Sequence, residues 1–159
     1  MLNECHNCQL TTAALYDKIS YLPFHYSSIE RGMANNHVAP QGNALDAKSS
    51  VFQEAKITIS VDELLRAGMI APADIVKMDV DGNERFIIKG MQNFLQGYYG
   101  KKPRLIQIEV MMREFDLIRK TMSGFGYKNT ASIPGSSDKT AHNMIFIAQD
   151  STLYFPNFE

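Results

Sequence analysis

The sequence has few cysteines, no long apolar run and almost no net charge. Two cysteines are too few for a disulfide framework. No apolar run approaches the roughly 18 residues of a membrane span, and no basic segment followed by an apolar stretch opens the chain. With 16 basic and 17 acidic residues the net charge is −1, which argues against a general nucleic-acid binder. We therefore predict a cytoplasmic protein with no membrane or nucleic-acid partner.

The two cysteines, Cys5 and Cys8, form a CxxC pair with His6 between them. Such a pair can be a redox motif or half of a zinc site. A closed zinc site needs four ligands, and the sequence has no second cysteine pair. A redox pair is expected between a strand and a helix, but only four residues precede Cys5. We favour two thiols without a shared function and predict no metal site.

Length and composition predict one globular domain. The chain has 159 residues, of which 45% are hydrophobic and 21% charged. We assign residues 1–150 to this domain and residues 151–159 to a C-terminal tail, loose or docked.

Strand and helix patterns alternate along most of the chain. Apolar runs predict strands at residues 11–15, 19–26, 55–59, 75–80, 104–110 and 143–148. Helical spacing predicts helices at residues 60–68, 84–97 and 112–122, and Ser60 and Glu63 have the spacing of a capping box at the first. Residues 27–50 and 130–140 are predicted loops. This order predicts an α/β fold, a three-layer sheet with parallel central strands.

The stretch from Ala73 to Leu95 carries the clearest chemical signal, because a strand passes into a helix there. Asp79 and Asp81 lie at that turn, where ligands bind in open α/β sheets. Glu109 lies near the end of the next predicted strand, so we expect it on the same rim as Asp79. For Asp81 the alternative is ordinary capping of the helix start.

The run Lys77-Met-Asp-Val-Asp-Gly-Asn-Glu84, followed by Lys89-Gly90-Met91, resembles the signature of the FkbM-type methyltransferases, which use S-adenosylmethionine. The strand Leu105–Val110 resembles the next strand of that family, which ends in an acidic residue. Residues 124–127 and 143–146 resemble its closing segments. The resemblance extends from about residue 13 to residue 147.

The resemblance implies a Rossmann-like methyltransferase sheet that transfers a methyl group to an oxygen of a sugar or another small hydroxylated metabolite. Such domains begin with a strand and a glycine-rich turn, and a second strand follows. Here the ten glycines are scattered and no GxGxxG run occurs. The chain therefore corresponds to the C-terminal part of the domain, with the first two strands absent. The alternative is a non-catalytic α/β interaction module whose exposed sheet edge pairs with a second copy or a partner chain.

The candidate site residues follow from this comparison and from the predicted rim. Asp79 or His142 would act as the base, the alternative for His142 being a satisfied surface residue. The residues that would bind the cofactor are Asp79, Asp81 and, on its adenine side, Asp17. The substrate-binding candidates are Glu109 and Asn143 on the rim, and Asn35, Asn36 and His37 in the loop at residues 27–50. We predict that this loop is a flap over the rim, with plain disorder as the alternative.

Overall fold

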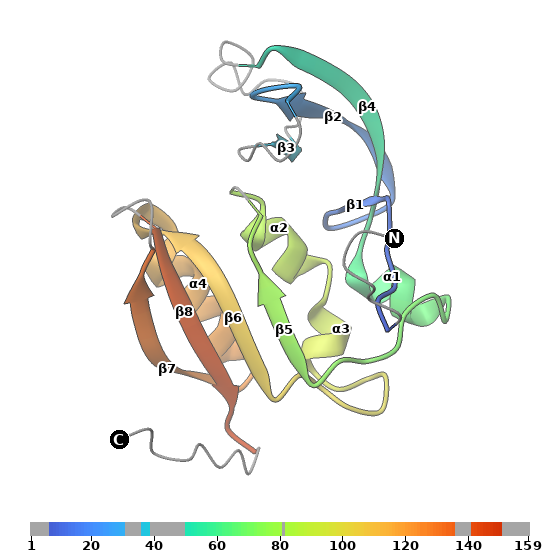
Figure 1. Cartoon of the computed structure of the whole chain (residues 1–159). Coiled ribbons are helices and arrows are strands. Elements are labelled where there is room, and N and C mark those ends of the chain that lie inside the picture. The colour runs from blue at the N-terminus through green and yellow to red at the C-terminus, as the bar shows by residue number, and fades with distance from the viewer. Residues whose placement is uncertain (1–6, 31–35, 39–49, 81, 136–140, 151–159) are drawn as a thin grey trace.

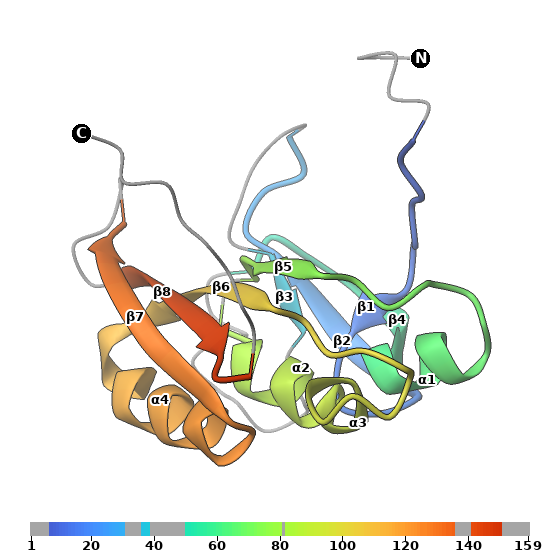
Figure 2. The same cartoon turned by 90° about the horizontal axis from the view of Figure 1, so that it is seen from below.

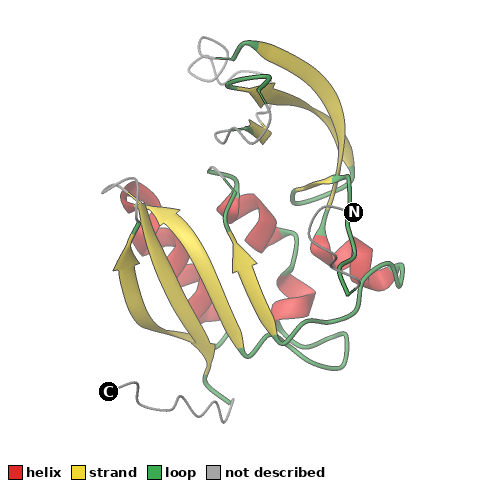
Figure 3. Cartoon of the chain, viewed as in Figure 1, coloured by secondary structure: helices red, strands yellow, loops and turns green. Residues whose placement is uncertain are grey.

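A computed structural model gives the fold of the chain and describes residues 7–30, 36–38, 50–80, 82–135 and 141–150 (Figure 1). These residues form a mixed α/β fold with two four-stranded sheets and four α-helices (Figure 3). The predicted tail at residues 151–159 and Cys5 lie outside them, and Cys8 carries a free, exposed thiol. None of the described helices is long and apolar enough to cross a membrane.

The first sheet has the strand order β1-β4-β2-β3. Its strands are β1 (Ala14–Leu15), β2 (Ser20–Tyr26), β3 (His37–Val38) and β4 (Phe52–Ile59). β4 runs parallel to β1 and antiparallel to β2, and β3 is antiparallel to β2. In Figure 1, β2 and β4 form a long curved arm that extends away from the helices. The strands predicted at residues 19–26 and 55–59 are thus confirmed, the second of them beginning three residues earlier, whereas the strand predicted at residues 11–15 is confirmed only at Ala14–Leu15.

The second sheet has the order β5-β6-β8-β7. Its strands are β5 (Ile75–Met78), β6 (Leu105–Met111), β7 (Tyr127–Pro134) and β8 (Ala141–Ala148). β5 and β6 are parallel, whereas β8 is antiparallel to both β6 and β7. Three alternate residues of β6, Ile106, Ile108 and Val110, are buried on one face, so that face packs on the core.

The helices that cover this buried face are α2 (Glu84–Lys89), α3 (Gln92–Leu95) and α4 (Phe115–Gly124). Figure 2 shows all three on the same side of the second sheet. A 3₁₀ turn (Met112–Glu114) precedes α4, and together they confirm the helix predicted at residues 112–122. We call the opposite side of the sheet, which carries no helix among the described residues, its open face.

The fold class differs in two respects from the predicted three-layer Rossmann-like sheet lacking its first two strands. The described strands form two sheets, and the second sheet is one layer covered by helices on one face (Figure 2). Among the described strands, parallel pairing is limited to β5 with β6 and β1 with β4, and β8 runs antiparallel to β6. An apolar run alone carries no information about strand direction, so the sequence could not reveal that β8 is antiparallel to β6.

The helix predicted at residues 84–97 is interrupted at Gly90, where α2 ends and α3 soon begins. A Cβ atom at position 90 would lie 2.3 Å from the carbonyl oxygen of Tyr16 and 3.0 Å from the Cα of Asp17. Glycine is therefore required here by the close approach of the chain that follows β1. The Lys89-Gly90 part of the signature thus joins the two sheets.

The prediction of a loop at residues 130–140 is wrong for residues 130–134, because these residues belong to β7. β7 is an edge strand whose side chains are mostly exposed, so it lacks the apolar alternation that identifies strands in a sequence. Its pairing with β8 shifts register between Asn129 and Ala131. Residues 136–140 lie outside the described part of the chain.

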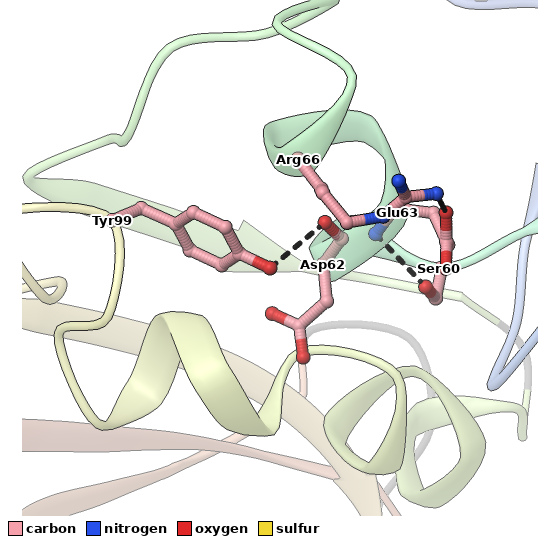
Figure 4. Close-up of polar contacts among 5 residues, drawn as sticks. All are labelled: Ser60, Asp62, Glu63, Arg66 and Tyr99. Carbon is pink, nitrogen blue, oxygen red and sulfur yellow. Dashed lines mark hydrogen bonds and ion pairs between the residues drawn. The ribbon is translucent and has the colours of Figure 1, made fainter.

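Helix α1 (Val61–Arg66) has Ser60 as its N-cap, as predicted. The Ser60 hydroxyl accepts a hydrogen bond of 3.1 Å from the backbone N–H of Glu63. The Glu63 carboxylate pairs with Arg66 instead of returning to the helix start, so only half of the predicted capping box forms (Figure 4).

The residue after the first position of α1, Asp62, ties this helix to α3. Its two carboxylate oxygens accept hydrogen bonds from the backbone N–H groups of Asn93 and Phe94, each 2.9 Å long. The Tyr99 hydroxyl donates to the Asp62 carbonyl oxygen at 3.0 Å (Figure 4). Because α1 directly follows β4, these bonds hold the first sheet to the helical layer of the second.

Candidate functional site

The signature residues form the turn between β5 and α2. Gly82 has a φ of 94°, which favours glycine, and its backbone N–H donates to Glu84 Oε1 at 3.1 Å. The Asn83 N–H donates to the Val80 carbonyl oxygen at 3.0 Å. The Glu84 side chain is therefore a buried part of the turn, with 3% of the residue exposed. Asp81, the predicted cofactor ligand or cap, lies outside the described residues.

Asp79 follows the last residue of β5 and lies at the carboxyl end of the strand, as predicted. Its Oδ2 is 2.8 Å from Lys77 Nζ. Hydrogen bonds with Lys77 first and with Glu109 second hold the pKa of the Asp79 carboxyl below its usual value. The same contact with Asp79 raises the pKa of Lys77. Asp79 is therefore ionised at neutral pH and accepts hydrogen bonds.

The open face carries a polar row across three strands at this end of the sheet. The β5–β6 register pairs Met78 with Ile108, so Asp79 comes next to Glu109. Glu109 in turn pairs with Asn143 on β8. Gln107 Nε2 donates to Asn143 Oδ1 at 2.7 Å and fixes that amide. The structure thus brings together three predicted residues, Asp79, Glu109 and Asn143.

A cavity of about 270 Å³ lies beside Asp79, between the two sheets. The second sheet and α2 contribute Asp79, Val80, Asn83 and Ile87 to its lining; the first sheet and the predicted flap contribute Ala14, Leu15, Phe24, Asn36 and Val38. The predicted substrate residue Asn36 therefore lines the same cavity as Asp79. Its Oδ1 accepts a hydrogen bond of 3.2 Å from the backbone N–H of Ser27, the first residue of the predicted loop.

The other two loop candidates, Asn35 and His37, do not line this cavity among the described residues. Asn35 lies outside the described residues, and for His37 only the backbone is described, paired with His25 of β2. Motion of the loop as a flap stays a prediction. The pairing of β3 with β2 holds Val38, buried in the cavity wall, in an extended conformation.

Asp17, the predicted ligand on the adenine side, points at the signature. Its Oδ2 is 2.8 Å from Lys89 Nζ, and its side chain is only 11% exposed. Its other oxygen, Oδ1, is buried without a hydrogen-bond partner in the described structure. Asp17 is not among the residues that line the Asp79 cavity.

His142 lies on the helix-covered face and not on the open face. Its ring centroid is 6.1 Å from that of Phe115, at the start of α4, and its Nδ1 is 3.1 Å from the Ser132 hydroxyl. Its register partner on β6 is the fully buried Val110. The structure therefore does not bring His142 together with Asp79, and its role as a base stays a prediction.

Sequence reasoning missed Lys77, Asn83 and Phe24 as site residues. Lys77 could have been found, since a residue two positions before Asp79 on a strand shares its face. The sequence carries no signal that Phe24 lies near Asp79, because this proximity depends on how the β2–β4 arm folds over the second sheet.

Comparison with known proteins identifies the family. Residues 2–128 match the model of the methyltransferase FkbM domain. The chain belongs to this family. One similar protein is the hexuronic acid methyltransferase AglP of Haloferax volcanii, 49% identical over 39 residues, which is 24% of this chain and 16% of that protein. The chain thus matches only a small share of that protein's length. No solved structure matches the chain significantly.

FkbM methyltransferases generally use S-adenosylmethionine. The described residues do not by themselves fit this whole cofactor. Pockets for ligands of comparable size enclose roughly 300–1,000 Å³, and the Asp79 cavity is smaller. Its lining is mainly aliphatic and aromatic, with Asn36, Asp79 and Asn83 as the polar side chains. This set suits a small hydroxylated group.

Proposed function

We propose that this chain forms the acceptor-binding part of a methyltransferase that uses S-adenosylmethionine and methylates an oxygen of a sugar or another small hydroxylated metabolite. Membership of the FkbM family supports the reaction class. The short match to a hexuronic acid methyltransferase supports a sugar acceptor. We also propose that the second sheet is the C-terminal half of a Rossmann-like sheet. The parallel β5–β6 pair, joined through α2 and α3, supports this assignment.

The observation that carries the proposal is the ionised Asp79 in the wall of the cavity. A carboxylate there accepts a hydrogen bond from an acceptor hydroxyl and fixes its orientation, which is a large part of catalysis by proximity. A base works best with a pKa near the operating pH, so the lowered pKa favours an orienting role for Asp79. The cofactor supplies the methyl group when bound. Asn36 and Asn83 would complete the polar contacts of the acceptor, and Phe24 would contact its ring.

Titration of the ¹⁵N-labelled chain with glucuronic acid and with glucose, followed by NMR, tests acceptor binding. We expect shift changes at residues 79–83 and 36–38, and a loss of affinity of about tenfold or more in Asp79→Asn, since a charged hydrogen bond contributes about 1.5–3 kcal/mol. Asp116→Asn is the matched control, because Asp116 is an exposed carboxylate on α4. Shifts that map elsewhere, or equal affinity in both variants, would reject the acceptor site.

Transfer of a tritiated methyl group from S-adenosylmethionine to the same sugars tests the reaction. We expect Asp79→Asn to reduce transfer and Asp116→Asn to leave it unchanged. Sugar binding at the cavity without any transfer would show that this chain binds the acceptor but does not methylate it alone.

A second candidate function is that of an interaction module, and the edge position of β5 favours it. Among the described strands, β5 pairs with β6 alone. Unpaired edges invite pairing with other chains, in a homo-oligomer or with a partner. Light scattering after size exclusion tests self-association, and a monomer at high concentration would reject the homo-oligomer.

A further inference from the structure

A second cavity, of about 260 Å³, lies between α2 and α4 and is called here the helix groove. Figure 2 shows both helices on the same side of the second sheet. The groove is open to solvent, since the side chains of Arg85 and Lys89 at its rim are half exposed or more. Among the described residues, none lines both this groove and the Asp79 cavity. The helix groove is therefore a separate site that a ligand can reach from solution.

The floor of the helix groove is apolar and tightly packed. Ile88 of α2 and Ile118 of α4 line it and are each only 1% exposed. Phe86 of α2 is held by stacking on Tyr16, with the ring centroids 4.7 Å apart. Leu117 of α4 forms a wall that is 51% exposed. A ligand with an apolar body would remove this surface from water, and that removal favours binding.

Two positive charges border this floor. Arg85 and Lys89 lie one helical turn apart on α2, and no carboxylate of the described residues lines the groove with them. Outside the groove, Lys89 pairs with Asp17 at 2.8 Å, and Arg85 Nη1 is 3.8 Å from Glu114 Oε1. The second distance is too long for a hydrogen bond, so N–H groups of the guanidinium are available to a ligand. The rim of the groove therefore complements a negative charge.

Size and chemistry together select the ligand of the helix groove. Pockets for drug-sized ligands enclose roughly 300–1,000 Å³, so this groove takes a smaller molecule. Tyr16 and the Arg85 guanidinium already lie against the Phe86 ring, so the remaining apolar surface is aliphatic. We propose that the helix groove binds a free, unbranched aliphatic monocarboxylate, with its carboxylate on Arg85 and Lys89 and its chain along the floor. This inference concerns binding and does not depend on the reaction proposed above.

Titration of the ¹⁵N-labelled chain with butanoate, hexanoate and octanoate at neutral pH, followed by NMR, tests the proposal. We expect shift changes at residues 85–92 and 117–121. Affinity should rise about two- to fourfold for each added CH₂ group, because an open groove buries the chain only in part. Octan-1-ol and octylamine are the controls for charge and should bind about tenfold more weakly than octanoate. No shift change at these residues with millimolar octanoate, an affinity independent of chain length, or equally tight binding of octylamine would overturn the proposal.

Substitutions at the rim and in the groove locate the ligand. Arg85→Gln should weaken octanoate binding about tenfold, whereas Arg66→Gln, at an exposed arginine of α1 that also pairs with a carboxylate, should leave it unchanged. Thr121→Phe adds bulk inside the groove and should also weaken binding, and Ser123→Phe, at an exposed position of α4 outside the lining, is its control. Equal affinity in Arg85→Gln and Arg66→Gln would overturn the proposal. If Thr121→Phe does not fold, the chain-length series on the unmodified chain still decides.

Two other occupants of the groove would give different results. Light scattering would detect a dimer of the chain alone, and a dimer that Thr121→Phe dissociates would assign the groove to a second copy. Binding to vesicles of anionic phosphatidylglycerol that Thr121→Phe abolishes, without binding of free octanoate, would assign the groove to a membrane surface. Either result would overturn the proposal.

Discussion

The two sheets of this protein differ in how their side chains are covered. In the second sheet, Ile106, Ile108 and Val110 of β6 and Met144 and Phe146 of β8 are almost fully buried on the face that α2, α3 and α4 cover. In the first sheet the described residues bury few apolar side chains, and Tyr21, Phe52 and Ile57 are exposed. Apolar burial is the dominant favourable term in folding. The second sheet therefore supplies most of the stability, and the first depends on its contacts with it.

Side-chain contacts within β2 and between β2 and β4 partly replace a core in the first sheet. The rings of Phe24 and Tyr26 are 5.0 Å apart, and Lys56 Nζ lies 4.6 Å from the centre of the Phe24 ring. Tyr26 also contacts Phe52 and donates a hydrogen bond to Glu54. Contacts of this kind contribute about 0.2–1 kcal/mol each, well below the stabilisation from a buried aliphatic side chain.

The largest expected effect comes from truncating one isoleucine in each sheet. Ile108→Ala in β6, where the residue is 0% exposed, should reduce the free energy of unfolding by about 2–5 kcal/mol, because it leaves a cavity. Ile57→Ala in β4, where the residue is 46% exposed, should cost less than about 1 kcal/mol. Urea unfolding of both variants measures the difference. Equal losses would contradict the assignment of stability to the second sheet.

The next effect concerns the close contact that joins the two sheets. In Gly90→Ala the new Cβ would overlap the Tyr16 carbonyl oxygen, so the chain after β1 must move, at a cost of about 1–3 kcal/mol. Gly124→Ala is the matched control, because nothing lies within 4 Å of its Cβ position. Hydrogen exchange should show the first sheet loosened in Gly90→Ala while the second sheet keeps its protection. A uniform change in both sheets would instead mean that they unfold as one unit.

A smaller loss of stability is expected at the second contact between the two sheets, where Asp62 of α1 caps the start of α3. Asp62→Ala removes the acceptor of two backbone N–H groups and should reduce the free energy of unfolding by about 0.5–2 kcal/mol. For a protein of this size the melting temperature falls by about 2–4 °C per kcal/mol. Asp116→Ala, at an exposed carboxylate, is the control. An unchanged melting temperature in Asp62→Ala would show that this cap does not stabilise the protein.

The same contrast explains which features the sequence could predict. The strand–turn–helix at Asp79 and the strand with Glu109 are local patterns with buried apolar residues, and both were found in the predicted order. β7 was missed because an exposed edge strand has no apolar alternation. The break at Gly90 was missed because its cause, Tyr16, lies far away in the sequence. The Asp79 cavity could be predicted only in part, since its walls come from both sheets and only Asp79 and Asn36 had been proposed.

The smallest effects concern two similar ion pairs, one in each sheet. Lys77 pairs with Asp79 in the second sheet, and Lys56 with Glu54 in the first, both two residues apart along a strand. Both pairs lower the pKa of the carboxyl group, but the main causes differ. For Asp79 the largest cause is the hydrogen bond from Lys77, whereas for Glu54 it is the hydrogen bond from Tyr26, followed by that from Lys56.

Lys77→Met should therefore raise the pKa of Asp79, whereas for Glu54 the larger rise should come from Tyr26→Phe and the smaller from Lys56→Met. Carboxyl ¹³C titrations by NMR measure all three. A lowered pKa in the folded state stabilises the protein above the unfolded value of about 3.9, and this stabilisation is lost as the pH falls through the folded pKa. Lys77→Met should thus lose at most about 1 kcal/mol near pH 7, since Asp79 is 47% exposed, and should match the unmodified protein once Asp79 is protonated in both. A difference that persists in acid would mean that Lys77 stabilises β5 through its packing and not through its charge.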